Sequence, residues 1–168
     1  MNRPLLQPGQ HLVTTFGLGF CRPASGTWGS LPPVVLAALL LAVGLPAEGM
    51  AFGLVMAAMV GLFGGACVRF GDEAAARFGR SDPSQVVADE TAGMALVLAF
   101  LPAGTTATPT LAAVTLLLAF LAFRILDILK PWPADLLERA PSGWGVLLDD
   151  LAVAVYAIIA LHIAALAI

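Results

Sequence analysis

Three groups of acidic residues stand at separate places in the sequence and could together bind a metal ion. The first is Asp89 with Glu90, the second is Asp127, and the third is Asp149 with Asp150. Carboxylate oxygens with no histidine or cysteine beside them suit Mg²⁺ or Mn²⁺ better than zinc. If the five acids meet in the fold, each is a candidate metal ligand or catalytic acid.

The segment FRILDILKPWP brings two cations next to one of these acids. Arg124, Asp127 and Lys130 are spaced i, i+3 and i+6, roughly one helical face, until Pro131 and Pro133 end the helix. An arginine fork and a lysine point charge beside a metal ligand suit a bound phosphate. Cations that snorkel to the membrane surface at a helix end would give the same pattern, so this segment alone leaves both interpretations open.

A glycine-rich segment, TFGLGFCRPASGTWGSLPP, predicts a tightly turning loop ahead of a helix. Backbone N–H groups around Gly26, with the hydroxyls of Ser25 and Thr27, could bind an anion near the helix N-terminus. Such turns before helices are common, so an ordinary turn is the simpler interpretation of this segment alone.

The elements that must position these residues are membrane helices. The chain is 60% hydrophobic and 11% charged, with a mean hydropathy of +0.93, whereas an ordinary soluble domain has about 25% charged residues. We therefore predict an all-α fold: an integral membrane bundle of about five short transmembrane helices, in a single domain over residues 1–168. The five apolar stretches cover about 28–45, 50–68, 86–101, 110–126 and 146–168.

The cations indicate how this zigzag, the alternation of membrane-spanning helices and turns, is oriented across the membrane. All eight Lys and Arg residues fall on one side, whereas the loops expected on the other side contain Glu48 and no cation. The positive-inside rule predicts that the charged side is cytoplasmic. Because Pro32 and Pro33 weaken the first stretch, the first two stretches could instead form a re-entrant hairpin, which would leave the rest of the topology unchanged.

The same zigzag brings the three acidic groups to the cytoplasmic side. About eleven residues, or about 16 Å of helix, separate Glu90 from Pro102, whereas the hydrocarbon core is about 30 Å thick. Asp89 and Glu90 are therefore expected inside the membrane boundary, where an unpartnered charge costs at least about 2.5 kcal/mol. Only Arg124 and Lys130 offset the five acids, and a divalent cation would resolve the imbalance. The other acids on this side are expected to be solvated: Asp72, Glu73, Asp82, Asp135 and Glu138.

Two other classes of protein compete with an enzyme. Acids inside a membrane also line the paths of cation transporters and channels. Here the acids gather at one end, and the outer halves of the spans have few polar residues, such as Tyr156 and His162, to continue a path. A noncatalytic scaffold would not require five acids on three helix ends. The residues therefore favour a divalent-metal site with phosphate-binding cations beside it, as in a metal-dependent phosphatase.

Four segments resemble the bacterial phosphatidylglycerophosphatase A family in order and spacing: TFGLGFCRPASGTWGSL, DPSQVVADETAGM, FRILDILKPWP and SGWGVLLDDLAVAVYA. The most specific matches are Asp89 and Glu90 followed by Gly93, the FRxxDxxKPWP stretch, and the pair Asp149 and Asp150. Two loops depart from the family pattern: Ser25 stands where the family usually has proline, and Ser142 where glycine is common.

Members of this family are small inner-membrane proteins that use Mg²⁺ to remove the terminal phosphate of phosphatidylglycerophosphate, which leaves phosphatidylglycerol for phospholipid biosynthesis. The resemblance implies the same lipid substrate, Mg²⁺ cofactor, bacterial inner-membrane location and cytoplasmic-face site for this chain, with no nucleic-acid partner. It implies that Asp89, Glu90, Asp127, Asp149 and Asp150 are metal ligands or catalytic acids. It also implies that Arg124, Lys130, Gly26 and Thr27 contact the substrate phosphate.

Overall fold

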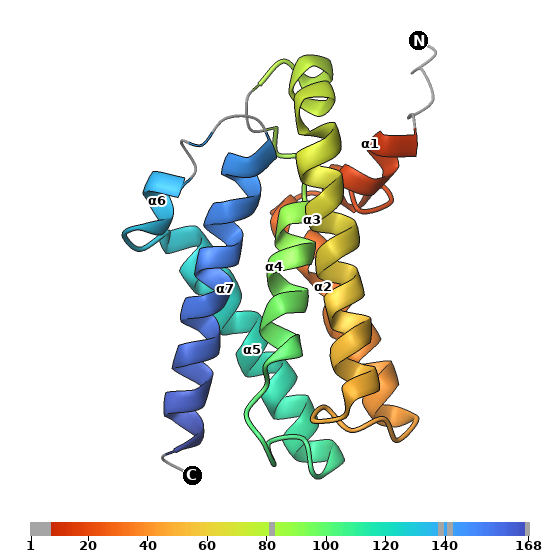
Figure 1. The fold of residues 1–168 in the computed structure, drawn as a ribbon, viewed down its shortest axis with the longest axis vertical. Helices are drawn as coiled ribbons and strands as arrows, with labels where there is room; N and C mark the ends of the chain where they lie inside the picture. Colours follow the sequence, from red (N-terminus) through yellow and green to blue (C-terminus); the bar gives the residue numbers. More distant parts are fainter. Residues whose placement is uncertain (1–7, 81–82, 138–139, 141–142, 167–168) are drawn as a thin grey trace.

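A computed structural model describes residues 8–80, 83–137, 140 and 143–166, and all regular structure in these ranges is helical. The elements in chain order are α1 (Pro8–Val13), the 3-10 helix η1 (Leu18–Phe20), α2 (Ser25–Ala42), α3 (Met50–Phe78), α4 (Ala88–Ala99), α5 (Pro109–Leu129), α6 (Ala134–Leu137) and α7 (Gly143–Ala165) (Figure 1). Asp82 and Glu138, which were predicted to be solvated, and Ser142, where the sequence departs from the family pattern, lie outside the described residues.

Four helices are long and apolar enough to cross a membrane: α2, α3, α5 and α7. The predicted all-helical membrane bundle is therefore confirmed. Its approximate count of five corresponds to these four helices and the shorter α4, which has 12 residues. Both α2 and α3 have a spanning length, so the first hairpin does not require the re-entrant alternative.

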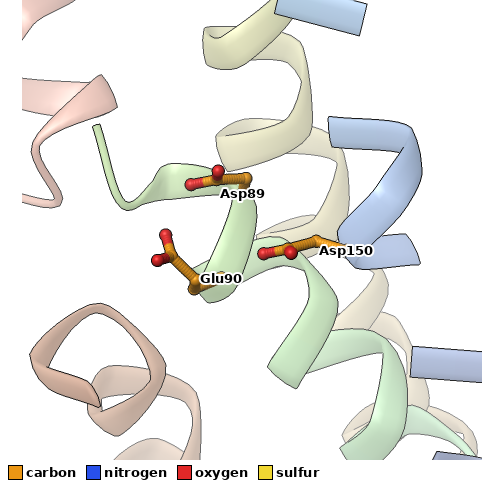
Figure 2. Close-up of side chains that lie close together, drawn as sticks. All are labelled: Asp89, Glu90 and Asp150. Carbon is orange, nitrogen blue, oxygen red and sulfur yellow. The ribbon is translucent and has the colours of Figure 1, made fainter. Parts of the chain in front are cut away.

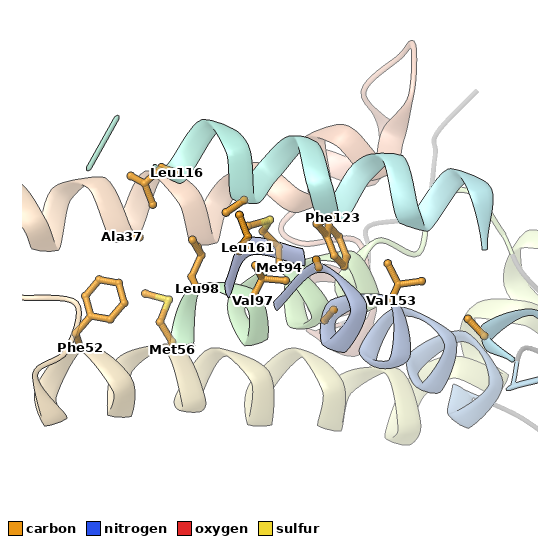
Figure 3. Close-up of a cluster of buried hydrophobic side chains, with 14 residues drawn as sticks. Ala37, Phe52, Met56, Met94, Val97, Leu98, Leu116, Phe123, Val153 and Leu161 are labelled. Atoms are coloured by element: carbon orange, nitrogen blue, oxygen red, sulfur yellow. The ribbon is translucent and has the colours of Figure 1, made fainter. Parts of the chain in front are cut away.

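The short helix α4 forms the centre of the bundle. It packs against α2, α3, α5 and α7 and lies between α3 and α7 in the view of Figure 1. Around it, large side chains such as Phe52, Met94, Leu98 and Phe123 are fully buried (Figure 3). At about 1.5 Å per residue, α4 is only about 18 Å long. Its first turn therefore begins within the bundle.

The two turns at the end opposite the start of α4 contact each other. The N–H of Gly104 donates a hydrogen bond of 2.8 Å to Oε1 of Glu48. This backbone hydrogen bond lowers the pKa of the exposed Glu48 carboxyl below its ordinary value. The contact holds the α2–α3 turn against the α4–α5 turn.

The start of α2 differs from the prediction. The glycine-rich segment was expected to remain a loop, but α2 begins at Ser25, so Ser25, Gly26 and Thr27 form its first turn. A Cβ atom added to Gly29 would lie 2.6 Å from Cβ of Val87. Glycine is needed at this position because α2 and the start of α4 approach so closely, and the same glycines made the segment resemble a loop.

The helix α3 continues past the apolar stretch to Phe78. On this charged extension Glu73 forms an exposed ion pair of 3.5 Å with Arg69, one turn before it. Asp72, Glu73 and Asp135 are exposed, as predicted for solvated acids.

Candidate active site

All five candidate acids line one cavity of about 340 Å³, where α4 and α7 begin and α5 ends. The full lining consists of Ser25, Ser84, Val86, Asp89, Glu90, Asp127, Ile128, Lys130, Val146, Asp149 and Asp150. Three segments far apart in the sequence thus supply carboxylates to the same space. The alternation of spans and turns explains this convergence, because it returns these helix ends to one side of the bundle.

Three of the acids form an inner cluster: Asp89, Glu90 and Asp150. Figure 2 shows these side chains next to one another, the first two from the first turn of α4 and the third from α7. One carboxylate oxygen from each lies within 4.8 Å of the others. Asp89 Oδ1, Glu90 Oε2 and Asp150 Oδ2 are buried and have no hydrogen-bond partner. Buried carboxylates without partners are costly, and a bound cation would offset that cost, so the inner cluster can hold a divalent metal ion.

The other two acids are each paired with a cation. Nη1 of Arg124 lies 2.6 Å from Oδ2 of Asp127, and Nζ of Lys130 lies 2.6 Å from Oδ2 of Asp149. Lys130 lines the cavity, whereas Arg124 is not among the lining residues and reaches the site through Asp127. A phosphate that entered the cavity would meet the Lys130 ammonium beside the carboxylates.

The position of Lys130 corrects one prediction. Arg124 and Asp127 do share a face of α5, but α5 ends at Leu129 and Lys130 follows with φ of 42°, in the left-handed region. Lys130 therefore leaves the face of α5 and reaches Asp149 of α7. The proline after it explains the early end of the helix, because the residue before a proline is disfavoured in the α conformation.

The first turn of α2 closes over the acid cluster at Gly26. A Cβ atom added at this residue would collide with Oε1 of Glu90 and would lie 2.9 Å from Nη2 of Arg124. Nε of Arg124 is buried and has no hydrogen-bond partner. Ser25 lines the cavity, whereas Thr27, the other predicted phosphate contact in this turn, is not among the lining residues.

A buried hydrogen-bond network fixes the start of α4. The hydroxyl of Thr91 donates to the carbonyl oxygen of Gly29 in α2 at 2.7 Å and lies 2.8 Å from the hydroxyl of Thr15. The N–H of Val87 donates to the carbonyl oxygen of Val13 at 2.9 Å. These bonds join α4 to α2 and to the segment after α1, so the inner acids lie on a firmly held helix start. That location is also favourable for negative charge because of the helix dipole.

Sequence reasoning missed three polar residues of this region. Ser84 lines the cavity, and Thr15 and Thr91 form the supporting network. Thr91 directly follows the acidic pair, and Ser84 lies in the segment that precedes it. For Thr91 and Ser84 the signal in the sequence was a polar residue near the acids at a helix start, and this signal does not distinguish a buried hydroxyl from a solvated one. Thr15 has no such signal, because it is far from the acids in the sequence.

The fold and the site together define a class of protein, a multi-pass membrane phosphatase. Its cavity combines carboxylates that can hold a divalent cation with the ammonium of Lys130, and the Arg124 guanidinium lies next to the cavity residue Asp127. The sequence profile described as phosphatidylglycerophosphatase A matches residues 11–165. The chain belongs to the phosphatidylglycerophosphatase A family.

Relatives with assigned names agree with this assignment. A Haemophilus influenzae protein named phosphatidylglycerophosphatase A is 36% identical over 92% of this chain and 87% of its own length. The Escherichia coli K12 protein of the same name is 30% identical over 86% of this chain and 76% of its own. A Bacteroides thetaiotaomicron protein with the provisional name phosphatidylinositol-3-phosphatase is 33% identical over 98% of this chain and 97% of its own. No solved structure matches the chain.

Family membership decides among the classes that the residues left open. The chain is an enzyme, a phosphoric monoester hydrolase, rather than a cation transporter or a scaffold. The resemblance seen in the four sequence segments is confirmed over most of the chain.

Proposed function

We propose that this protein hydrolyses phosphatidylglycerophosphate to phosphatidylglycerol and phosphate in a Mg²⁺-dependent reaction at the cytoplasmic face of a bacterial inner membrane. The observation that carries the proposal is the inner cluster, three carboxylates that each have one buried oxygen without a hydrogen-bond partner, near Arg124 and Lys130. The names of the Haemophilus and Escherichia relatives support the choice of substrate.

Asp89, Glu90 and Asp150 are the proposed ligands of Mg²⁺. Ligand oxygens of one octahedral Mg²⁺ ion lie about 3 Å apart when adjacent and about 4.2 Å apart when opposite, and the cluster oxygens lie within 4.8 Å of one another. The three carboxylates would therefore draw together around the ion. When bound, the ion would polarise the phosphoryl group and offset the charge of the acids. Asp127 and Asp149 complete the acidic lining, as further ligands or catalytic acids.

Arg124 and Lys130 are the proposed phosphate contacts. The guanidinium of Arg124 has an unpartnered buried Nε and could turn toward two phosphate oxygens, while the Lys130 ammonium adds a point charge. Gly26 and Thr27 belong to the first turn of α2, where the helix dipole favours an anion. The N–H of Thr27 already donates to the carbonyl oxygen of Ala24 at 3.0 Å, so its hydroxyl is the group that could contact the phosphate. Together these groups would stabilise the charge that develops on the phosphoryl oxygens.

Two routes for the attack on phosphorus fit the five acids. In one, a carboxylate accepts a proton from water, and the water oxygen attacks while the P–O bond to the glycerol oxygen breaks. In the other, a carboxylate such as Asp89 attacks phosphorus first while the P–O bond to the glycerol oxygen breaks, and water then hydrolyses the resulting aspartyl phosphate to free carboxylate and phosphate. Rapid quenching with ³²P-labelled substrate separates the routes, because only the second leaves labelled protein.

The proposed orientation follows from the distribution of charge. Arg22, Arg69, Arg77 and Arg80 lie with Arg124 and Lys130 toward the cavity end, whereas residues 43–49 and 100–108 at the opposite end contain no Lys or Arg. Cations are retained on the cytoplasmic side of the inner membrane. A cysteine introduced at Arg80 in a cysteine-free background should be protected from an impermeant maleimide in intact spheroplasts, and one at Glu48 should be labelled.

The decisive experiment is phosphate release by the purified protein in lipid–detergent micelles. We expect release from phosphatidylglycerophosphate with Mg²⁺, little with EDTA, and recovery when Mg²⁺ is restored. Glycerol 3-phosphate, phosphatidic acid and phosphatidylinositol 3-phosphate are the comparison substrates, the last because of the Bacteroides relative. Undiminished activity in EDTA would overturn the metal assignment, and faster hydrolysis of phosphatidylinositol 3-phosphate would overturn the substrate.

A further inference from the structure

An apolar groove of about 410 Å³ runs along α2, beginning at the end of the helix that borders the acid cavity. Its lining residues are all hydrophobic: Leu18, Trp28, Leu31, Pro32, Val35, Leu36 and Leu39. Trp28 is 40% exposed, Val35 54% and Leu39 58%, so these side chains face the surroundings of the bundle rather than its core. We name this feature the α2 groove.

The α2 groove and the acid cavity meet on one face of α2. Ser25 lines the cavity, and Trp28, Pro32, Leu36 and Leu39 follow it at i+3, i+7, i+11 and i+14. This spacing places all five residues along one stripe of a helix. A molecule with its head in the cavity could therefore continue into the groove without crossing to another helix face.

The length of the α2 groove matches one leaflet of a membrane. From Trp28 to Leu39 a helix rises about 17 Å, which is about half of a hydrocarbon core of about 30 Å. Trp28 stands at the end next to the cavity, and tryptophan is enriched at the membrane–water interface. The groove thus begins at head-group level and ends near the bilayer centre.

Two other apolar grooves do not have this relation to the cavity. One is lined by α7 residues Trp144, Leu147 and Leu151, which lie on the side of α7 away from the cavity-lining Val146 and Asp150. The other lies between the far ends of α2 and α5 and includes Glu48. Neither could receive a chain attached to a head group in the acid cavity.

Building on the proposed function, we propose that the α2 groove binds one acyl chain of the lipid whose phosphorylated head group occupies the acid cavity. Most of the cavity lining is charged or polar, which is unfavourable for hydrocarbon, so the chain would leave the cavity at the head-group level. The α2 groove offers the continuous apolar path from that level. The site would thereby select a phosphate monoester that carries a long chain over a soluble phosphate monoester.

The first test fills the groove. Val35→Trp adds bulk halfway along it, and Val155→Trp is the matched control, because Val155 is a similarly exposed valine of α7 outside the groove. We compare kcat/KM for dipalmitoyl and dihexanoyl phosphatidylglycerophosphate, whose short chains end before Val35. Val35→Trp should lower kcat/KM for the dipalmitoyl lipid about fivefold, a modest loss because the displaced chain exchanges groove contacts for equally apolar lipid contacts. The dihexanoyl lipid should be unaffected, and so should both lipids with Val155→Trp.

Loss of activity toward both lipids in Val35→Trp, or the same chain-length effect in Val155→Trp, would overturn the α2 groove as the chain site. If the wild-type protein released no phosphate from either lipid, the proposed function would fall instead. Photo-crosslinking then decides the groove without turnover, using dipalmitoyl phosphatidylglycerophosphate with a diazirine in mid-chain. Labelling concentrated in residues 28–39 and reduced by Val35→Trp supports the proposal, whereas even labelling of α2, α5 and α7 would identify surrounding lipid and overturn it.

Discussion

The two ends of the bundle use carboxylates in opposite ways. At the far end, the exposed Glu48 accepts a hydrogen bond from Gly104 and holds two turns together. At the cavity end, Asp89, Glu90 and Asp150 are drawn into the bundle, and each keeps an oxygen without a partner. The first arrangement stabilises the fold, whereas the second costs free energy that only a bound cation would recover. A candidate catalytic carboxylate therefore differs from a structural one in having a buried oxygen without a hydrogen-bond partner.

The largest predicted effect is at the cavity end. Asp150→Asn keeps the shape of the side chain and removes one buried charge, so phosphate release should fall roughly 10³-fold through loss of transition-state charge stabilisation. The melting temperature of the protein in EDTA should stay the same or rise, because removal of a like charge relieves repulsion in the cluster. Activity assays and thermal unfolding in detergent measure the two effects. The control is Asp135→Asn, at an exposed acid of α6, which should leave activity within about twofold, as for most surface changes. If Asp150→Asn instead lowered Tm strongly and left turnover normal, Asp150 would be a structural carboxylate rather than a catalytic one.

The contact between α2 and the cluster should be the next most sensitive. In Gly26→Ala the added methyl group would meet Oε1 of Glu90 and the Arg124 guanidinium, so α2 or these side chains must shift. A displacement of this kind should lower kcat about 10²-fold. Gly53→Ala in α3 is the control, because a Cβ there meets no atom within 4 Å, and it should leave kcat unchanged. Equal activity of the two variants would show that the close approach at Gly26 has no role in turnover.

A smaller effect is expected where charge is kept and geometry is changed. Arg124→Lys retains the cation beside Asp127 but loses the planar fork, so kcat/KM should fall about tenfold. Arg124→Gln, which also removes the charge, should lose clearly more. The ratio of the two losses, measured with the same lipid micelles, separates the contribution of the fork from that of the charge. Identical losses would mean that only the charge matters.

The smallest effect should come from the far end. Glu48→Ala removes the acceptor of the Gly104 N–H, so stability should fall by less than about 1 kcal/mol, as for an exposed hydrogen bond, while phosphate release stays normal. The pKa of Glu48 is lowered from 4.5, so its stabilisation is present above pH 4.5 and is lost as the pH falls through the lowered pKa. The Tm difference between wild type and Glu48→Ala should therefore shrink on acidification below pH 4.5. A large loss of activity in Glu48→Ala at neutral pH would contradict the purely structural role of the carboxylate at the far end.

The convergence of the acids was predictable from sequence because it depends only on topology. Alternating apolar spans and turns return every second helix end to the same side, and the one-sided distribution of cations supports this arrangement. The start of α2 was not predictable in this way. Gly26 and Gly29 indicate a loop by local preference, yet they lie in a helix. Glycine is needed at both positions because Glu90 and Val87 approach too closely for any side chain.

The pairing within the site also depends on contacts that sequence does not contain. The i, i+3 spacing predicted the contact of Arg124 with Asp127. The contact of Lys130 with Asp149 depends on the left-handed backbone after α5 and on the approach of α7. Similarly, Thr91 has an ordinary side chain for a helix, and only packing against α2 reveals its role in holding the acidic turn.

The shortness of α4 has a consequence for how the protein enters the membrane. A segment of 12 residues with two acids in its first turn is shorter than the roughly 17 residues that a spanning helix needs, and its acids would be costly to bury in the membrane without partners. Its neighbours in the chain, α3 and α5, are both long and apolar enough to insert by themselves. Insertion of α5 would draw α4 into place, and α2 and α7 would shield it as they pack. The acids of the site would thus reach their depth only when the surrounding helices assemble, which couples completion of the active site to completion of the fold.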